Sequence, residues 1–152
     1  MDIYTLIRND HNDAKKIMDK IEKMPLDRHE EKLALFHHLR EDVIAHNESE
    51  EHSFYAALRQ HSETRADANQ SEKEHHEAAL MLDDLYDDEM EAEQWAEKFY
   101  KLRVAVLQHI VKEEDKVFAA AQNVLTKETA HKLVHVMQDL KKRKRVLLKK
   151  AG

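Results

Sequence analysis

The sequence predicts an all-α fold, an up-down-up-down four-helix bundle with an additional C-terminal helix. A single proline, Pro25, and a single glycine, Gly152, leave few of the residues from which hairpin turns are built. Residues of high helix propensity dominate, and charged residues make up 37% of the chain. Apolar residues recur at spacings of three and four along segments joined by short connections. This pattern is typical of antiparallel helices around one core.

The first two helices are delimited by N-caps and by the proline. We expect the first to run from Asp2, whose carboxylate can cap a helix start, to about Met24. It should end there because a residue that precedes proline disfavours the helical conformation. The second helix should begin at Asp27, with Glu30 completing a capping box, and continue to about His61.

The start of the third helix has two candidates, because capping boxes open both at Thr64 and at Ser71. The earlier start is favoured because it places His75 about as far from the connecting loop as Glu50 of the preceding helix. Antiparallel neighbours should carry ligands at equal height, at about 1.5 Å per residue. The acidic stretch 87–91 should end this helix.

Two more helices complete the fold. The fourth should span residues 91–123, and Thr126 can cap a fifth that continues to about Lys150. We therefore expect a bundle formed by residues 1–123 and a basic C-terminal helix, residues 124–152, packed on it.

The C-terminal segment is basic, whereas the rest of the chain is acidic. Residues 126–152 hold nine Lys or Arg against two acidic residues, a local charge of +7 that leaves −13 for the remainder of a chain with net charge −6. An apolar stripe predicts that this helix packs on the bundle, with its basic residues facing the acidic body or water. Although the basic run 141–145 could contact nucleic acid, we do not expect such a partner.

The chain shows no signal for a membrane. Its first residues lack the basic and apolar regions of a signal peptide, and no apolar run approaches the roughly 18 residues that a membrane span needs. We expect a cytoplasmic protein without a membrane partner. The sequence does not specify the oligomeric state.

Two parts of the chain repeat one pattern of potential metal ligands. An acidic residue precedes a lone histidine in Asp10-His11 and in Glu74-His75. The pattern His-x-x-x-Glu-Glu begins 35 and 34 residues after these histidines, at His46 and at His109. Because the chain has no cysteine, a metal ion would be held by imidazoles and carboxylates. The repeat predicts two related halves of one metal site.

Six candidate ligands lie on the apolar stripes of the expected helices: His11, His46, Glu50, His75, His109 and Glu113. Any one of these histidines alone is more often an ordinary buried residue with a hydrogen bond. A buried, unpaired carboxylate, however, costs several kcal/mol, and no Lys or Arg occupies the stripes near the two glutamates. A metal pair roughly 3.5 to 4 Å apart is the partner we expect. Iron suits these ligands, which also allow zinc or manganese.

The other histidines fall outside the repeated pattern, and we expect them at the surface or behind the site: His29, His37, His38, His52, His61, His131 and His135. His76 stays an alternative ligand because it adjoins His75. The repeat, however, aligns His75 rather than His76 with His11.

Residues 1–123 resemble the hemerythrin-like family, also called the HHE cation-binding domain. The resemblance lies in the two His-x-x-x-Glu-Glu patterns with their aromatic followers, Phe54-Tyr55 and Phe118. It implies a four-helix bundle with a non-haem diiron centre. His11 and His46 would bind one iron, His75 and His109 the other, and Glu50 and Glu113 would bridge them. Oxygen-carrying members add a histidine one turn after the ligand of the third helix, where this chain has Ala79.

The function we expect is binding or processing of a small oxidant, either oxygen, hydrogen peroxide or nitric oxide, at open iron positions. An enzyme of this kind would decompose peroxide, as a catalase does, or reduce nitric oxide. Two alternatives are a module that senses or binds iron or oxygen without turnover, and an interaction protein that acts through its basic C-terminal helix. The absence of a histidine at Ala79 favours reaction over reversible oxygen carriage, because it leaves a coordination position open.

Overall fold

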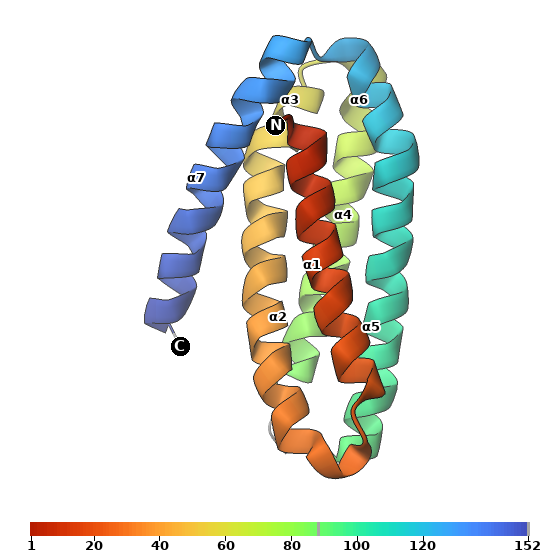
Figure 1. Cartoon of the computed structure of the whole chain (residues 1–152). Coiled ribbons are helices and arrows are strands. Elements are labelled where there is room, and N and C mark those ends of the chain that lie inside the picture. The colour runs from red at the N-terminus through yellow and green to blue at the C-terminus, as the bar shows by residue number, and fades with distance from the viewer. Residues whose placement is uncertain (88, 152) are drawn as a thin grey trace.

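The computed structural model describes residues 1–87 and 89–151, and it forms a four-helix bundle with one more helix on its outside (Figure 1). The four long helices of the bundle are α1 (Ile3–Lys23), α2 (His29–Glu50), α4 (Ser62–Leu85) and α5 (Ala92–Lys112). The described residues contain no strand. The predicted all-α fold class is thus confirmed.

Shorter segments extend two of these helices to the end of the bundle where the chain begins. A π-helical turn, η2 (Glu51–Tyr55), and α3 (Ala56–Leu58) continue α2, and a second π-helical turn, η3 (Glu113–Val117), and α6 (Phe118–Val124) continue α5. A 3-10 turn, η1 (Leu26–Arg28), joins α1 to α2, and α7 (Lys127–Ala151) ends the described chain.

The predicted cap of the first helix is confirmed. Asp2 Oδ1 accepts a hydrogen bond from the Thr5 amide at 2.9 Å, and α1 ends one residue before Met24, ahead of the proline. Thr126 also caps its helix, because its hydroxyl oxygen accepts from the Thr129 amide at 3.1 Å. At both positions, the polar oxygen satisfies an amide that has no partner inside the helix.

The predicted capping box at Asp27 is wrong, and so is the favoured one at Thr64. The helix expected at Asp27 begins instead at His29, after the η1 turn, and no side chain caps it. Ser71 lies buried inside α4, which begins earlier, at Ser62. The preference for the earlier start is confirmed, yet Thr64 is not its cap, because its hydroxyl donates to the Leu58 carbonyl at 2.7 Å. The Thr64 hydroxyl is directed at a carbonyl of the preceding segment, so it does not accept a hydrogen bond from the amides at the start of α4.

Two apolar clusters lie one after the other along the axis of the bundle. The first contains Tyr4, Phe54, Phe118 and the buried face of α7, and the second surrounds Trp95. Along each of the four long helices and their extensions, the predicted ligands fall between the residues of one cluster and those of the other. The candidate site is therefore a polar layer between two apolar ones.

The C-terminal helix α7 lies beside α2 on the outside of the bundle (Figure 1). Its buried residues Ala130, Val134 and Met137 belong to the first apolar cluster, together with residues of α1 and α3. The predicted boundary between residues 1–123 and 124–152 stays a prediction. Within the described residues, no helix combines the length and the apolar character required to cross a membrane.

Candidate metal centre

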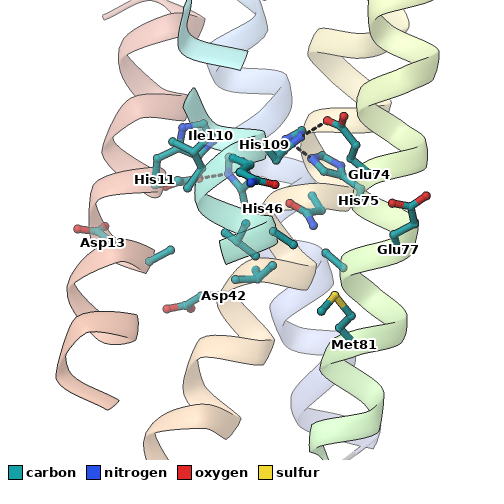
Figure 2. A pocket seen from close by; sticks show the side chains of 18 of the residues that line it. His11, Asp13, Asp42, His46, Glu74, His75, Glu77, Met81, His109 and Ile110 are labelled. Carbon is teal, nitrogen blue, oxygen red and sulfur yellow. Dashed lines mark hydrogen bonds and ion pairs between the residues drawn. The ribbon is translucent and has the colours of Figure 1, made fainter. Parts of the chain in front are cut away.

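All six predicted ligands converge in the polar layer. His11, His46, Glu50 and Glu113 form one group and Glu50, His75 and His109 another, and within each group one potential ligand atom per residue lies within 4.8 Å of the others. Figure 2 shows the four imidazoles directed toward one another from α1, α2, α4 and α5. Glu50 belongs to both groups, so the two groups adjoin and share one potential ligand.

The inward nitrogen of the imidazoles is Nε2. Nε2 of His11 lies 3.1 Å from Glu113 Oε1, and Nε2 of His75 lies 3.2 Å from Glu50 Oε1. Nε2 of His75 and Nε2 of His109 are 3.1 Å apart. Nitrogen lone pairs and carboxylate oxygens therefore meet in one place, as the chelation of an ion requires.

The outward nitrogen Nδ1 of every imidazole contacts a carboxylate. The four pairs are His11 with Glu114 at 2.7 Å, His46 with Asp10 at 2.8 Å, His75 with Glu51 at 2.9 Å and His109 with Glu74 at 2.8 Å. In a neutral imidazole, a carboxylate at Nδ1 fixes the proton there and leaves Nε2 with a free lone pair. It also fixes the rotation of the ring and so aims Nε2 at the site.

Sequence reasoning missed these four carboxylates as functional residues, although the repeat contains their signal. Asp10 and Glu74 are the acidic residues that precede the lone histidines, and Glu51 and Glu114 are the second glutamates of the two His-x-x-x-Glu-Glu patterns. Each pairs with a histidine of another helix. The neighbour in sequence of one ligand thus orients a different ligand.

Tyr55 was also missed as a site residue. Its hydroxyl donates a hydrogen bond to Glu113 Oε2 and lies 3.4 Å from His75 Nε2. Burial, with the charges of Glu113 and Glu50, raises the pKa of this hydroxyl well above its usual value. The group therefore stays protonated as a donor. At the equivalent position in the second half stands Phe118, so Tyr55 makes the two halves of the site unequal.

The two central glutamates are fully buried and short of partners. Both Glu50 oxygens, Glu113 Oε1 and His46 Nε2 make no hydrogen bond within the described part of the chain. Burial alone would raise the pKa of Glu50, but His46 and His75 outweigh it and hold this pKa well below its usual value. Buried carboxylates that stay ionised need a cation, which is a protonated imidazole without metal and a metal ion when one is bound. The donor set therefore fits one or more metal ions.

The comparison with protein families agrees with this geometry. The model of the hemerythrin HHE cation-binding domain matches residues 2–121. The chain belongs to this family. Neither the comparison with curated proteins nor that with solved structures gave a match. As an HHE domain, the protein carries a buried cluster of histidines and glutamates that could bind metal, within the matched residues.

A π-helical turn begins at one central glutamate of this HHE domain and directly after the other. Glu50 is the last residue of α2 before η2, and Glu113 is the first residue of η3. A π turn widens the helix by one residue and often marks a functional site. In the first half, the hydroxyls of Ser49 and Ser53 donate to the carbonyls of His46 and Ser49, at 2.9 and 2.6 Å. These bonds satisfy carbonyls near the widened turn.

A cavity of about 420 Å³ opens beside the imidazoles of the HHE domain. Figure 2 shows the four histidines at one end and Met81 at the other. Apolar side chains such as Val43, Ala78 and Val106 form its walls, and Asp13 and Glu77 lie at its exposed rim. The cavity thus gives small molecules a path to the cluster between apolar walls and a charged rim.

His76, the alternative ligand, and Ala79, where oxygen carriers have a histidine, lie outside the cluster. His76 is exposed on α4 and faces a different hollow, which it lines together with Ala79. It belongs to neither group of potential ligands found among the described residues. Ala79 is half-buried one turn after His75, so the HHE domain carries no imidazole there.

Proposed function

We propose that this HHE domain holds two iron ions in its polar layer. His11 and His46 would bind one ion, His75 and His109 the other, and Glu50 and Glu113 would contact both. The observation that supports this proposal is the pair of fully buried glutamates, of whose four oxygens only Glu113 Oε2 has a hydrogen bond within the described residues, while four Nε2 atoms face them. Without a cation such an arrangement costs several kcal/mol.

Iron is the metal that we propose, because imidazole and carboxylate ligands without thiolate suit it, although they also suit zinc and manganese. Metal analysis of the protein as isolated, combined with its ultraviolet and visible spectrum, tests both the element and the number of ions. Two iron ions per chain are expected. Zinc or manganese as the bound element would contradict this part of the proposal.

The reaction we propose is binding or turnover of hydrogen peroxide or nitric oxide. Two bound iron ions would supply open coordination positions and electrons for such molecules. The apolar walls of the cavity, Val43, Ala78 and Val106, keep bulk water away from these positions. The Tyr55 hydroxyl holds a proton at the Glu113 carboxylate, within reach of a small molecule at the cluster. Ala79 leaves open the place that an additional imidazole would occupy.

Substitution of one central glutamate tests the ligand assignment. Glu113→Ala should lose bound metal and melt at a lower temperature in the presence of metal, because a bound ion stabilises the native state by linkage. His76→Ala is the matched control, since His76 is exposed beside a proposed ligand. It should keep its metal. Equal metal loss in both variants would refute the assignment.

Peroxide consumption separates turnover from mere binding. The iron-loaded protein should consume hydrogen peroxide or nitric oxide faster than the same amount of free iron. Ala79→His should slow this consumption without expelling iron, because the added imidazole can reach the metal from one turn beyond His75. A long-lived oxygen adduct that releases oxygen intact, without consumption of peroxide or nitric oxide, would instead favour a binding or sensing module.

The contacts of the basic helix α7 do not support a separate function as an interaction surface. Lys141, Lys144 and Arg145 each contact a carboxylate of the bundle, at 2.8, 2.8 and 3.0 Å. Their charges thus meet the acidic body of the same chain. We therefore keep the metal site as the centre of the proposal.

A further inference from the structure

The helix α7 lies beyond the residues that the family model matches, yet it reaches the metal cluster. Lys141 Nζ donates to both carboxylate oxygens of Asp10, each at 2.8 Å. Asp10 Oδ2 in turn lies 2.8 Å from His46 Nδ1. The side chains of Lys141 and Asp10 are only 15% and 16% exposed, so water competes little for either group.

The second half of the site contains the same arrangement within the bundle itself. Lys112 Nζ donates to Glu74 Oε2 at 3.0 Å, and Glu74 Oε1 lies 2.8 Å from His109 Nδ1. Lys112 is three residues after His109, in the same helix. The residue three positions after His46 is Ser49. The first half thus has no lysine at this position of its own helix, and α7 supplies one in its place.

We propose that Lys141 is a positioning residue for the metal centre. It holds Asp10 by both oxygens, and Asp10 holds the His46 ring with Nε2 directed into the cluster. Loss of the ammonium group would free the Asp10 carboxylate to rotate, and His46 would lose its fixed orientation. This proposal rests on the proposed function only in taking His46 as a ligand. It makes α7 a part of the metal site and not only of the apolar core.

Substitutions within α7 of the full chain test the proposal. Lys141→Met keeps most of the length of the side chain and removes its charge, and Lys141→Arg keeps a charged donor. Lys144→Met is the matched control, because Lys144 makes an ion pair of the same length, 2.8 Å, with Glu48 on the same side of α7 but contacts no histidine. The measurement is competition of each variant with a chelator for Fe²⁺ or Co²⁺, together with the Co²⁺ absorption spectrum.

We expect Lys141→Met to bind one of the two ions roughly 10- to 100-fold more weakly, the range seen when groups behind metal ligands are removed. The Co²⁺ bands of that ion should shift. Lys141→Arg should recover most of the affinity, and Lys144→Met should match the unchanged protein. Circular dichroism checks that helix content is preserved, and Lys141→Gln replaces Lys141→Met if it is not.

Three outcomes would overturn the proposal. Unchanged affinity and spectrum in Lys141→Met would show that Asp10 orients His46 without help. Equal weakening in Lys141→Met and Lys144→Met would show that α7 acts through general packing. A protein that binds no pair of ions before any substitution would overturn the proposed function together with this inference, whereas the first two outcomes leave the proposed function intact.

Discussion

Each imidazole of the cluster has one ring nitrogen directed at the other ligands and one directed at a carboxylate. Burial alone would lower the pKa of His46, but Glu50 and Asp10 outweigh it and raise this pKa to about 10. Burial is likewise outweighed at His75, where Glu50 and Glu51 raise the pKa to about 9. The metal-free protein therefore holds protons at the positions where the proposed ions would bind.

Metal binding should release protons near neutral pH. With folded pKa values of about 10 and 9, His46 and His75 are protonated at pH 7 in the metal-free protein, and a metal ligand must be neutral. We expect the apparent metal affinity to rise from pH 6.5 to about 10. Calorimetry in buffers of different ionisation enthalpy measures the protons released. Metal binding without proton release at pH 7 would contradict this prediction.

The same pKa shifts predict how the stability of the metal-free protein depends on pH. A histidine whose pKa is raised on folding stabilises the protein fully below its unfolded pKa, about 6.5. That contribution is lost as the pH rises through the folded pKa values of about 9 and 10. The free energy of unfolding of the metal-free protein should therefore fall between pH 6.5 and about 10. Over the same range, the affinity of the protein for its proposed ions should rise.

The Tyr55 hydroxyl should matter more without metal than with it. Tyr55→Phe removes the donor to Glu113, and an unpaired buried acceptor costs about 1–3 kcal/mol. We expect a loss of this size in the free energy of unfolding of the metal-free protein, and a smaller loss with metal, because an ion also neutralises Glu113. Urea unfolding with and without metal measures both.

Tyr4→Phe is the control for this substitution. The Tyr4 side chain is buried, and its hydroxyl makes no hydrogen bond within the described residues. Its removal should leave the free energy of unfolding nearly unchanged or slightly higher. A loss in Tyr4→Phe as large as that in Tyr55→Phe would mean that the contact with Glu113 contributes nothing specific.

At the scale of the elements, the helices owe their ends to different causes. Asp2 and Thr126 cap α1 and α7 with their side chains, whereas α2 and α4 begin without a side-chain cap. One π turn begins directly after Glu50 and the other begins at Glu113. Side-chain caps thus mark the starts of the first pair of helices but not those of the second.

Removal of the α7 cap should loosen this helix selectively. Thr126→Ala deletes the acceptor of the Thr129 amide, and such a loss costs about 1 kcal/mol. We expect faster hydrogen exchange of amides in the first turns of α7. Ser62→Ala is the control, because the Ser62 hydroxyl donates to Glu63 and caps nothing. Equal acceleration at the starts of α4 and α7 in the two variants would contradict the assignment of Thr126 as a cap.

At the scale of the whole molecule, the polar layer is held between two apolar clusters, and α7 contributes to one of them. Val134 and Met137 are buried with Tyr4 and Phe54. Trp95 lies in the other cluster, beyond the metal layer. If the bundle and α7 unfold as one cooperative unit, a cavity beneath α7 must also lower the unfolding midpoint that Trp95 fluorescence reports.

Met137→Ala should lower the stability reported by Trp95 fluorescence. Truncation of a fully buried methionine costs about 2–5 kcal/mol. The fluorescence midpoint in urea should fall together with that of helix content. Val136→Ala, at a position 45% exposed, should leave both midpoints nearly unchanged. If the midpoint at Trp95 stayed constant while part of the helix content was lost early, residues 124–152 would form a separate unit.

Helical periodicity in the sequence was enough to predict the bundle and the face of each helix that carries a candidate ligand. It worked for His11, His46, Glu50, His75, His109 and Glu113 because the rotation of a side chain around its own helix depends on local geometry alone. The capping boxes expected at Asp27 and Thr64 failed because a cap motif is a weak preference that packing overrides. The identity and number of the metal ions stay predictions.

Contacts between helices were decided only by the tertiary structure. Asp10 pairs with His46 and not with its neighbour His11, and Tyr55 and Lys141 reach the site from segments that lie outside the repeated pattern. Such pairs depend on the height and rotation of one helix against another. A sequence pattern specifies the face on which a residue lies, whereas its partner is set by the packing of the neighbouring helix.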